Sequence, residues 1–69
     1  MPRFFIRANQ IEEANGEKII RIEGDDAHHI SRSLRMASGE KIEVCDMQKN
    51  VYFCTLTVFL DGQVIARID

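Results

Sequence analysis

The sequence predicts a small, mainly β domain, a closed or nearly closed barrel of about five short strands with one inserted helix. Three observations predict it: five runs have the alternation or β-rich composition of strands, one segment has a helical period, and Asp61-Gly62 is a strong hairpin signal. A chain of 69 residues has room for one domain, residues 1–69. Short hairpin turns in so small a chain favour a barrel, because closure removes the sheet edges. The five predicted strands are Arg3–Arg7, Lys18–Ile22, Lys41–Cys45, Val51–Leu60 and Val64–Ile68.

The first strand is aromatic and flanked by arginines. Alternation places Phe4 and Ile6 on one face of it, and Arg3, Phe5 and Arg7 on the other. The following segment, residues 8–17, is polar and acidic and contains the turn signal Asn15-Gly16, so we expect an exposed loop. Gly24 is expected to end the second strand.

The helix is expected over residues 26–36. Asp25 or Asp26 can cap its start, because a short carboxylate accepts the free N–H groups of the first turn, and Gly39 is a plausible stop. At about 100° per residue, Ala27, Ile30 and Leu34 fall on one narrow apolar stripe that can dock on a core.

The opposite side of the same helix carries His28, Arg32 and Arg35. Two interpretations are open for this row. It is either a solvated face whose cations suit the negative end of the helix dipole, or a contact for an anion or a nucleic acid.

The later strands supply most of the expected core. In the run 51–60 the even-numbered side chains form the more apolar face, while Thr55 and Thr57 lie on the other. Asp61-Gly62 then returns the chain into the last strand. The predicted core residues are Ile20, Ile22, Ile30, Leu34, Ile42, Val44, Leu56 and Val58.

The composition restricts the partners. The formal net charge is −2, from 9 basic and 11 acidic residues, so any RNA or DNA site must come from local clustering of arginines. No run is long enough to span a bilayer and no signal peptide is present, so we expect a cytoplasmic protein without a membrane role. Cys45 and Cys54 are expected to be reduced, buried hydrophobes, with a cross-strand disulfide as the minor alternative.

No catalytic or metal centre is predicted. His28 and His29 are adjacent, so on a helix they point about 100° apart and cannot share one ion. Ser31 and Ser33 lack an identifiable orienting partner, and the glycines are isolated and form no phosphate-binding loop. We therefore expect no catalytic residue, no metal and no cofactor in this chain.

Specific segments resemble a known family. The opening Arg3-Phe4-Phe5-Ile6, the run from Asp25 to Met36 (DDAHHISRSLRM) and Gly39-Glu40 are similar to the N-terminal region of the bacterial 16S ribosomal RNA uridine-N3 methyltransferases. The resemblance implies a PUA-like β-barrel that helps to hold 16S ribosomal RNA or the small ribosomal subunit. A separate C-terminal knotted domain would bind S-adenosylmethionine, carry out the methylation and form a homodimer.

With the resemblance added, we expect the chain to be an RNA-binding domain and not an enzyme by itself. The residues expected to contact RNA are Arg3, Arg7, His28, Arg32 and Arg35. The alternative is a protein–protein interaction module with no RNA role, using the Phe4/Phe5 strand or a Phe53/Phe59 surface.

Overall fold

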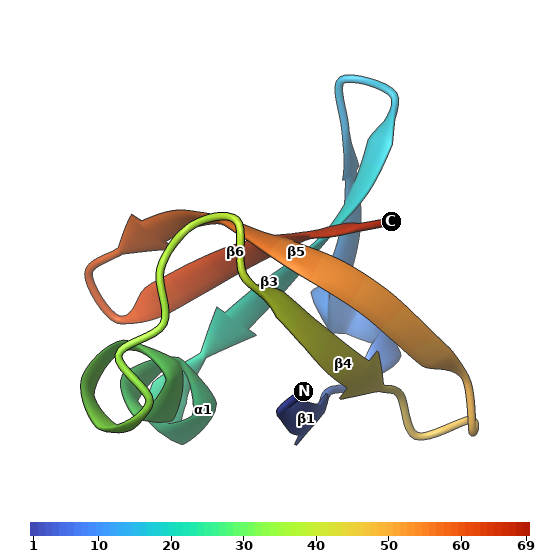
Figure 1. The fold of residues 1–69 in the computed structure, drawn as a ribbon. Helices are drawn as coiled ribbons and strands as arrows, with labels where there is room; N and C mark the ends of the chain where they lie inside the picture. Colours follow the sequence, from blue (N-terminus) through green and yellow to red (C-terminus); the bar gives the residue numbers. More distant parts are fainter.

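The computed structural model describes all 69 residues as one six-stranded sheet with a short helical segment at one end (Figure 1). The strands lie in the order β1-β4-β5-β6-β3-β2. Their bounds are β1 Arg3–Phe5, β2 Ile11–Ala14, β3 Glu17–Glu23, β4 Lys41–Cys45, β5 Val51–Leu60 and β6 Gln63–Ile68. A 3₁₀ turn covers Ala8–Gln10, and the helical segment comprises α1, Gly24–His28, and a π-helical turn, His29–Ser33.

The mainly β class is confirmed, but the five-stranded barrel is not. The two end strands, β1 and β2, are not paired with each other, so the sheet stays open. β1 pairs in parallel with β4, and every other pair is antiparallel.

The sixth strand lies in the segment that the sequence predicted to be a loop. β2 pairs with β3 across the two-residue turn Asn15-Gly16, in which both residues have a positive φ, of 53° and 79°. This is the backbone that Asn-Gly favours in tight hairpins. The hairpin extends away from the rest of the sheet (Figure 1). Its first strand, β2, is acidic and mostly exposed, so it has no hydrophobic alternation from which a strand could be predicted.

The core lies between the inner face of the curved sheet and the helical segment. The buried cluster is Phe4, Ile6, Ile20, Ile22, Ala27, Ile30, Ile42, Val44, Cys54, Leu56, Val64 and Ala66. Cross-strand pairing explains why these side chains meet. For example, Ile20 is opposite Ala66, which is in turn opposite Leu56, so one row of inward positions crosses three strands.

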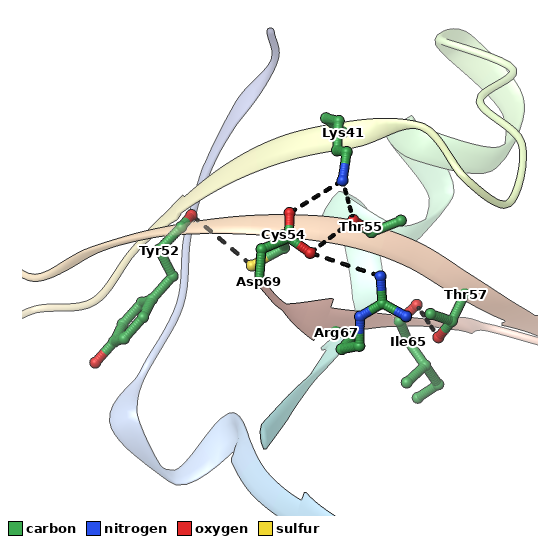
Figure 2. A network of polar contacts seen from close by, with 8 residues as sticks. All are labelled: Lys41, Tyr52, Cys54, Thr55, Thr57, Ile65, Arg67 and Asp69. Carbon is green, nitrogen blue, oxygen red and sulfur yellow. Dashed lines mark hydrogen bonds and ion pairs between the residues drawn. The ribbon is translucent and has the colours of Figure 1, made fainter. Parts of the chain in front are cut away.

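A β-bulge in β5 changes which of its residues face the core. Leu56 pairs with Ala66 and Val58 pairs with Ile65, so Thr57 is an extra residue. Its hydroxyl donates to the carbonyl oxygen of Ile65 at 3.1 Å, which Figure 2 shows. After the bulge the inward parity is reversed: Phe59, opposite Val64, packs against the core.

The bulge makes one core prediction wrong. Val58 was expected inside because it continues the even-numbered apolar face, but it is 46% exposed. Thr55, expected on the polar face, is buried to 8% exposure on the outer side of the sheet, where Lys41 and Asp69 cover it.

The helical segment is shorter and less regular than expected. α1 starts at Gly24, whose φ is 65°, and Asp25 and Asp26 lie in its first turn; neither caps it, since the N-cap is Glu23 without a side-chain cap. The backbone then widens, as the N–H of Leu34 donates to the carbonyl of His29, five residues back, at 2.9 Å. Arg35 ends the segment with a left-handed φ of 50°.

The π-helical turn also makes a second core prediction wrong, that of Leu34. Ala27 and Ile30 are buried as the apolar stripe predicted, but Leu34 is 40% exposed. The π turn carries one more residue than an α turn and rotates Leu34 away from the sheet. Met36, after the left-handed Arg35, packs against the core.

We expect the different burial of Ile30 and Leu34 to be measurable as a difference in the cost of truncating each side chain. Ile30→Val should lower the free energy of unfolding by about 0.5–1.5 kcal/mol, because it removes a fully buried methylene. The larger truncation Leu34→Ala should cost less than the loss of about 2–5 kcal/mol typical of a fully buried leucine, because that residue is 40% exposed. Urea unfolding of both variants checks this. A loss of about 2–5 kcal/mol for Leu34→Ala, as for a fully buried leucine, would mean that the helix continues regularly to residue 36.

Candidate nucleic-acid interface

Ion pairs divide the nine basic side chains into two groups. Four of them are paired: Arg3 with Glu43 at 2.7 Å, Arg21 with Glu12 at 2.8 Å, and both Lys41 and Arg67 with Asp69. The other five make no ion pair: Arg7, Lys18, Arg32, Arg35 and Lys49. A cation already held by a carboxylate must lose that partner to reach a phosphate, so the unpaired group is the better source of anion contacts.

The outer face of β4, β5 and β6 shows how cations are neutralised. Figure 2 shows Asp69 between Lys41, Thr55 and Arg67. Its carboxylate accepts from Thr55 at 2.8 Å and from Lys41 at 3.2 Å, and it lies 3.7 Å from Arg67. The Thr55 hydroxyl and the Lys41 ammonium together hold the pKa of Asp69 below its usual value. This face is therefore an internally compensated network and not a free basic patch.

The predicted residues His28 and Arg32 lie together, as the helical spacing indicated. Both line a hollow of about 550 Å³ between the helical segment and the turn that joins β5 to β6. Across the hollow lie Leu60, Asp61 and Gln63 from that turn. Both His28 and Arg32 are exposed, so they can reach a ligand in solution.

Arg7 lies beside a second hollow, which meets the first at Gly24. This second hollow is lined mainly by polar side chains of the 3₁₀ turn and β3, among them Gln10 and Arg21. Gln10 holds the two segments together, because its amide donates to the Arg21 carbonyl at 3.0 Å. The two hollows are thus neighbours on one side of the molecule, with an unpaired arginine at each.

The remaining two predicted residues are placed differently. Arg3 lies on β1 and its guanidinium contacts Glu43 of β4, which raises the pKa of Arg3 and leaves its charge compensated. Arg35 is exposed and unpaired, but it lines neither hollow. The predicted row assumed an α-helix through residue 35, and the π turn with the left-handed φ of Arg35 ends that geometry.

Residues that the sequence did not indicate complete the first hollow. Asp61 and Gly62 were recognised as a turn, and nothing in their local pattern places that turn against the helical segment. Gln63 is fixed there by accepting from Arg21 at 2.8 Å and donating to Glu23 at 3.0 Å. A long-range contact of this kind has no sequence signal in a single chain.

Other chemistry has little support in these residues. Cys45 and Cys54 are both free and buried, and burial raises the pKa of the Cys54 thiol to about 11, so it is a poor nucleophile at neutral pH. No group of His, Cys, Asp or Glu side chains is arranged to hold a metal ion. None of the helical segments has the length and hydrophobicity needed to cross a membrane.

Comparison with known families gives a specific match. The sequence model described as the RNA methyltransferase PUA domain matches residues 22–69, which include the helical segment, the residues that line the first hollow and the three strands β4, β5 and β6. A search of curated proteins finds no match.

Solved structures of similar fold are much longer than this chain. A protein described as hypothetical is 31% identical over 96% of the chain, with a TM-score of 0.80. The ribosomal RNA small subunit methyltransferase E from Neisseria gonorrhoeae, solved with S-adenosylmethionine, is 24% identical over 99% of the chain, with a TM-score of 0.73. A predicted RNA methyltransferase from Thermotoga maritima is 25% identical over 100% of the chain, with a TM-score of 0.71. The chain spans 27%, 27% and 28% of these three structures, respectively.

Two carboxylates that accept hydrogen bonds within the fold, those of Asp46 and Asp69, predict a loss of stability in acid. Asp46 accepts from the side chain and backbone of Asn50, from the Gln48 backbone and from the Tyr52 hydroxyl, which hold its pKa below its usual value. Such a group stabilises the fold fully above its unfolded pKa, about 3.9, and the stabilisation is lost as the pH falls through the lower folded value. Asp69 acts in the same direction.

We therefore expect the urea midpoint to fall steadily below about pH 4. Asp46→Asn should be less stable than the unmodified chain at pH 7, and the two should converge in strong acid, where Asp46 is protonated. A difference that stays constant from neutral to acid pH would contradict the assignment of the ionised carboxylate as the stabilising form.

Proposed function

Because the chain belongs to the family of RNA methyltransferase PUA domains, we propose that it binds RNA through the side on which His28, Arg32 and Arg7 lie. The observation that carries this proposal is that Arg32 and Arg7 make no ion pair and stand at two adjoining hollows. Free guanidinium groups bind phosphate in bidentate fashion, and an imidazole can stack on an unpaired base or donate to it.

The five residues predicted from the sequence have graded roles in this proposal. Arg32 and Arg7 contact phosphates, and His28 contacts a base or sugar between them. Arg35, exposed beyond the end of the π turn, adds a more distant phosphate contact. Arg3 contributes least, because it has to leave Glu43 to reach the backbone.

The wider activity is proposed from the family. The chain would position 16S ribosomal RNA, or the small ribosomal subunit, for methylation of uracil N3 by a separate domain that binds S-adenosylmethionine. That second domain would also form the homodimer. The family match supports a role beside an RNA methyltransferase domain, and the likeness to the Neisseria protein, a ribosomal RNA small subunit methyltransferase bound to S-adenosylmethionine, supports the RNA and the cofactor. The uracil N3 position and the homodimer rest on the family resemblance of the sequence alone.

A second candidate function is binding of a protein partner through exposed apolar side chains. Phe5 is 65% exposed and Phe53 is 54% exposed, and both flank β4 on the outer face of the sheet, where Val51 is also exposed. Exposed apolar patches of this kind mark protein–protein contacts. Phe4 and Phe59, the other aromatic residues considered for this role, are used instead for the core: Phe4 is buried and Phe59 packs against the cluster.

Salt dependence separates the two functions and tests the first. We expect Arg32→Ala to weaken binding of the chain to 16S ribosomal RNA and to reduce the slope of log affinity against log salt by about 0.7–1. Arg67→Ala is the matched control, because it removes the same charge from a side chain that already faces Asp69. Its effect should be clearly smaller.

Filter binding between about 50 and 200 mM salt measures both slopes. Equal effects of the two substitutions would mean that general charge, and not the side bearing the hollows, attracts the RNA. Binding without salt dependence would favour the apolar surface of Phe5 and Phe53.

A further inference from the structure

The hollow beside Arg32 has a lining poorly suited to a phosphate. Two carboxylates, Asp25 and Asp61, line it together with one guanidinium, so its charged side chains carry an excess of one negative charge. Both carboxylates are exposed, and neither takes part in an ion pair. A phosphate inside the hollow would be attracted by Arg32 and repelled by Asp25 and Asp61, so the phosphate contact proposed for Arg32 has to lie outside the hollow. A neutral group rich in N–H donors inside the hollow would satisfy the two carboxylates.

The hollow also offers surfaces for a flat ring. Leu60 lies at the hollow with about half of its surface exposed, whereas Ala27, the other apolar residue of the lining, is buried in the core. A planar base can pack against an aliphatic side chain and stack on a guanidinium plane such as that of Arg32. The volume of about 550 Å³ lies within the usual range of small-ligand sites.

The side-chain amide in the lining, that of Gln63, already has hydrogen-bond partners within the chain. The oxygen of Gln63 accepts from Arg21 and its nitrogen donates to Glu23, so these hydrogen bonds hold the side chain in one orientation. The free side-chain hydrogen-bonding groups of the lining are therefore the acceptors of Asp25 and Asp61, the donors of Arg32, and the side chains of His28 and Ser31.

From this lining we propose that the hollow receives one unpaired base of the RNA strand, and that it selects a base with an exocyclic amino group over uracil. This inference rests on the proposed RNA binding. Among the pyrimidines, cytosine presents its N4 amino group to a carboxylate, whereas uracil presents the O4 carbonyl at the same position. The carboxylate accepts from the first and repels the second.

A consequence follows for how RNA lies on the domain. If the linked domain of the proposed function methylates uracil, the base in this hollow is not the substrate base but a neighbouring one that anchors the strand. Arg32 would then be shared between the face of the base and the adjacent phosphate. Arg7, at the adjoining hollow, would contact the backbone on the other side of Gly24.

Two oligonucleotides of equal length and charge test the selection. We expect the chain to bind hexacytidylate about five- to tenfold more tightly than hexauridylate at neutral pH. Asp61→Asn should reduce this ratio towards one, since an amide can donate to uracil O4 as well as accept from cytosine N4. Glu13→Gln is the matched control, because it removes the same charge from an exposed position outside both hollows, and its ratio should equal that of the unmodified chain.

The possible outcomes separate the two proposals. Equal affinity for the two hexamers, or a ratio that Asp61→Asn leaves unchanged, overturns the base selection while the salt-dependent RNA binding stands. Absence of binding to either hexamer and to 16S ribosomal RNA overturns both. A circular dichroism spectrum of Asp61→Asn identical to that of the unmodified chain ensures that a lost preference is not lost folding.

Discussion

The β-bulge at Thr57 is the constraint on which the arrangement of this domain depends. β5 is the longest strand and pairs with both β4 and β6, so a change of parity along it affects the whole sheet. The extra residue lets Leu56 and Phe59 both face inward, where an unbroken strand would turn Phe59 out and Val58 in. The hydroxyl of Thr57 compensates the disrupted ladder by donating to the Ile65 carbonyl.

The bulge also anchors the segment that returns from the helical region. The N–H of Gly39 donates to the Leu56 carbonyl at 2.8 Å, and the Ser38 hydroxyl donates to the Thr57 carbonyl at 2.9 Å. One end of the connection from the π turn to β4 is therefore fixed to the bulged strand, while Ile30 fixes the other end in the core. The helical segment lies near the β5–β6 turn, and the hollow with His28 and Arg32 forms there.

The local sequence pattern was sufficient to predict most of the strands. It failed to predict which side chains face the core after an irregularity in the backbone. The alternation of Lys41–Cys45, the β-rich run Val51–Leu60 and the Asp61-Gly62 turn identified three elements with little error, because the signal for each lies within the element itself. Val58 and Leu34 were misplaced for one shared reason: an inserted residue, in a bulge or in a π turn, shifts every later side chain. Nothing in the surrounding composition distinguishes such an insertion from regular structure.

The candidate site was predictable to the same extent and for the same reason. His28 and Arg32 are four residues apart on a short helical segment, so a helical wheel was enough to bring them together. The compensation of Arg3 by Glu43 and the position of Asp61 opposite Arg32 depend on contacts between distant strands and turns. A single sequence contains no measure of such pairing, so the five predicted cations could not be ranked before the fold was known.

The distribution of charge has a consequence for how such a domain can serve an RNA enzyme. With a net charge of −2 and four cations held in ion pairs, the domain has few positive groups left to release counterions from RNA. Two or three phosphate contacts give only weak affinity and a shallow dependence on salt. Weak binding becomes effective when a second RNA-binding unit is linked to the first, because the second contact is then intramolecular. Under the proposed function, a linked methyltransferase domain and its dimer partner would supply this gain. The selectivity of the domain would then come from the shape and acceptors of its hollow, and not from the strength of its attraction to the RNA backbone.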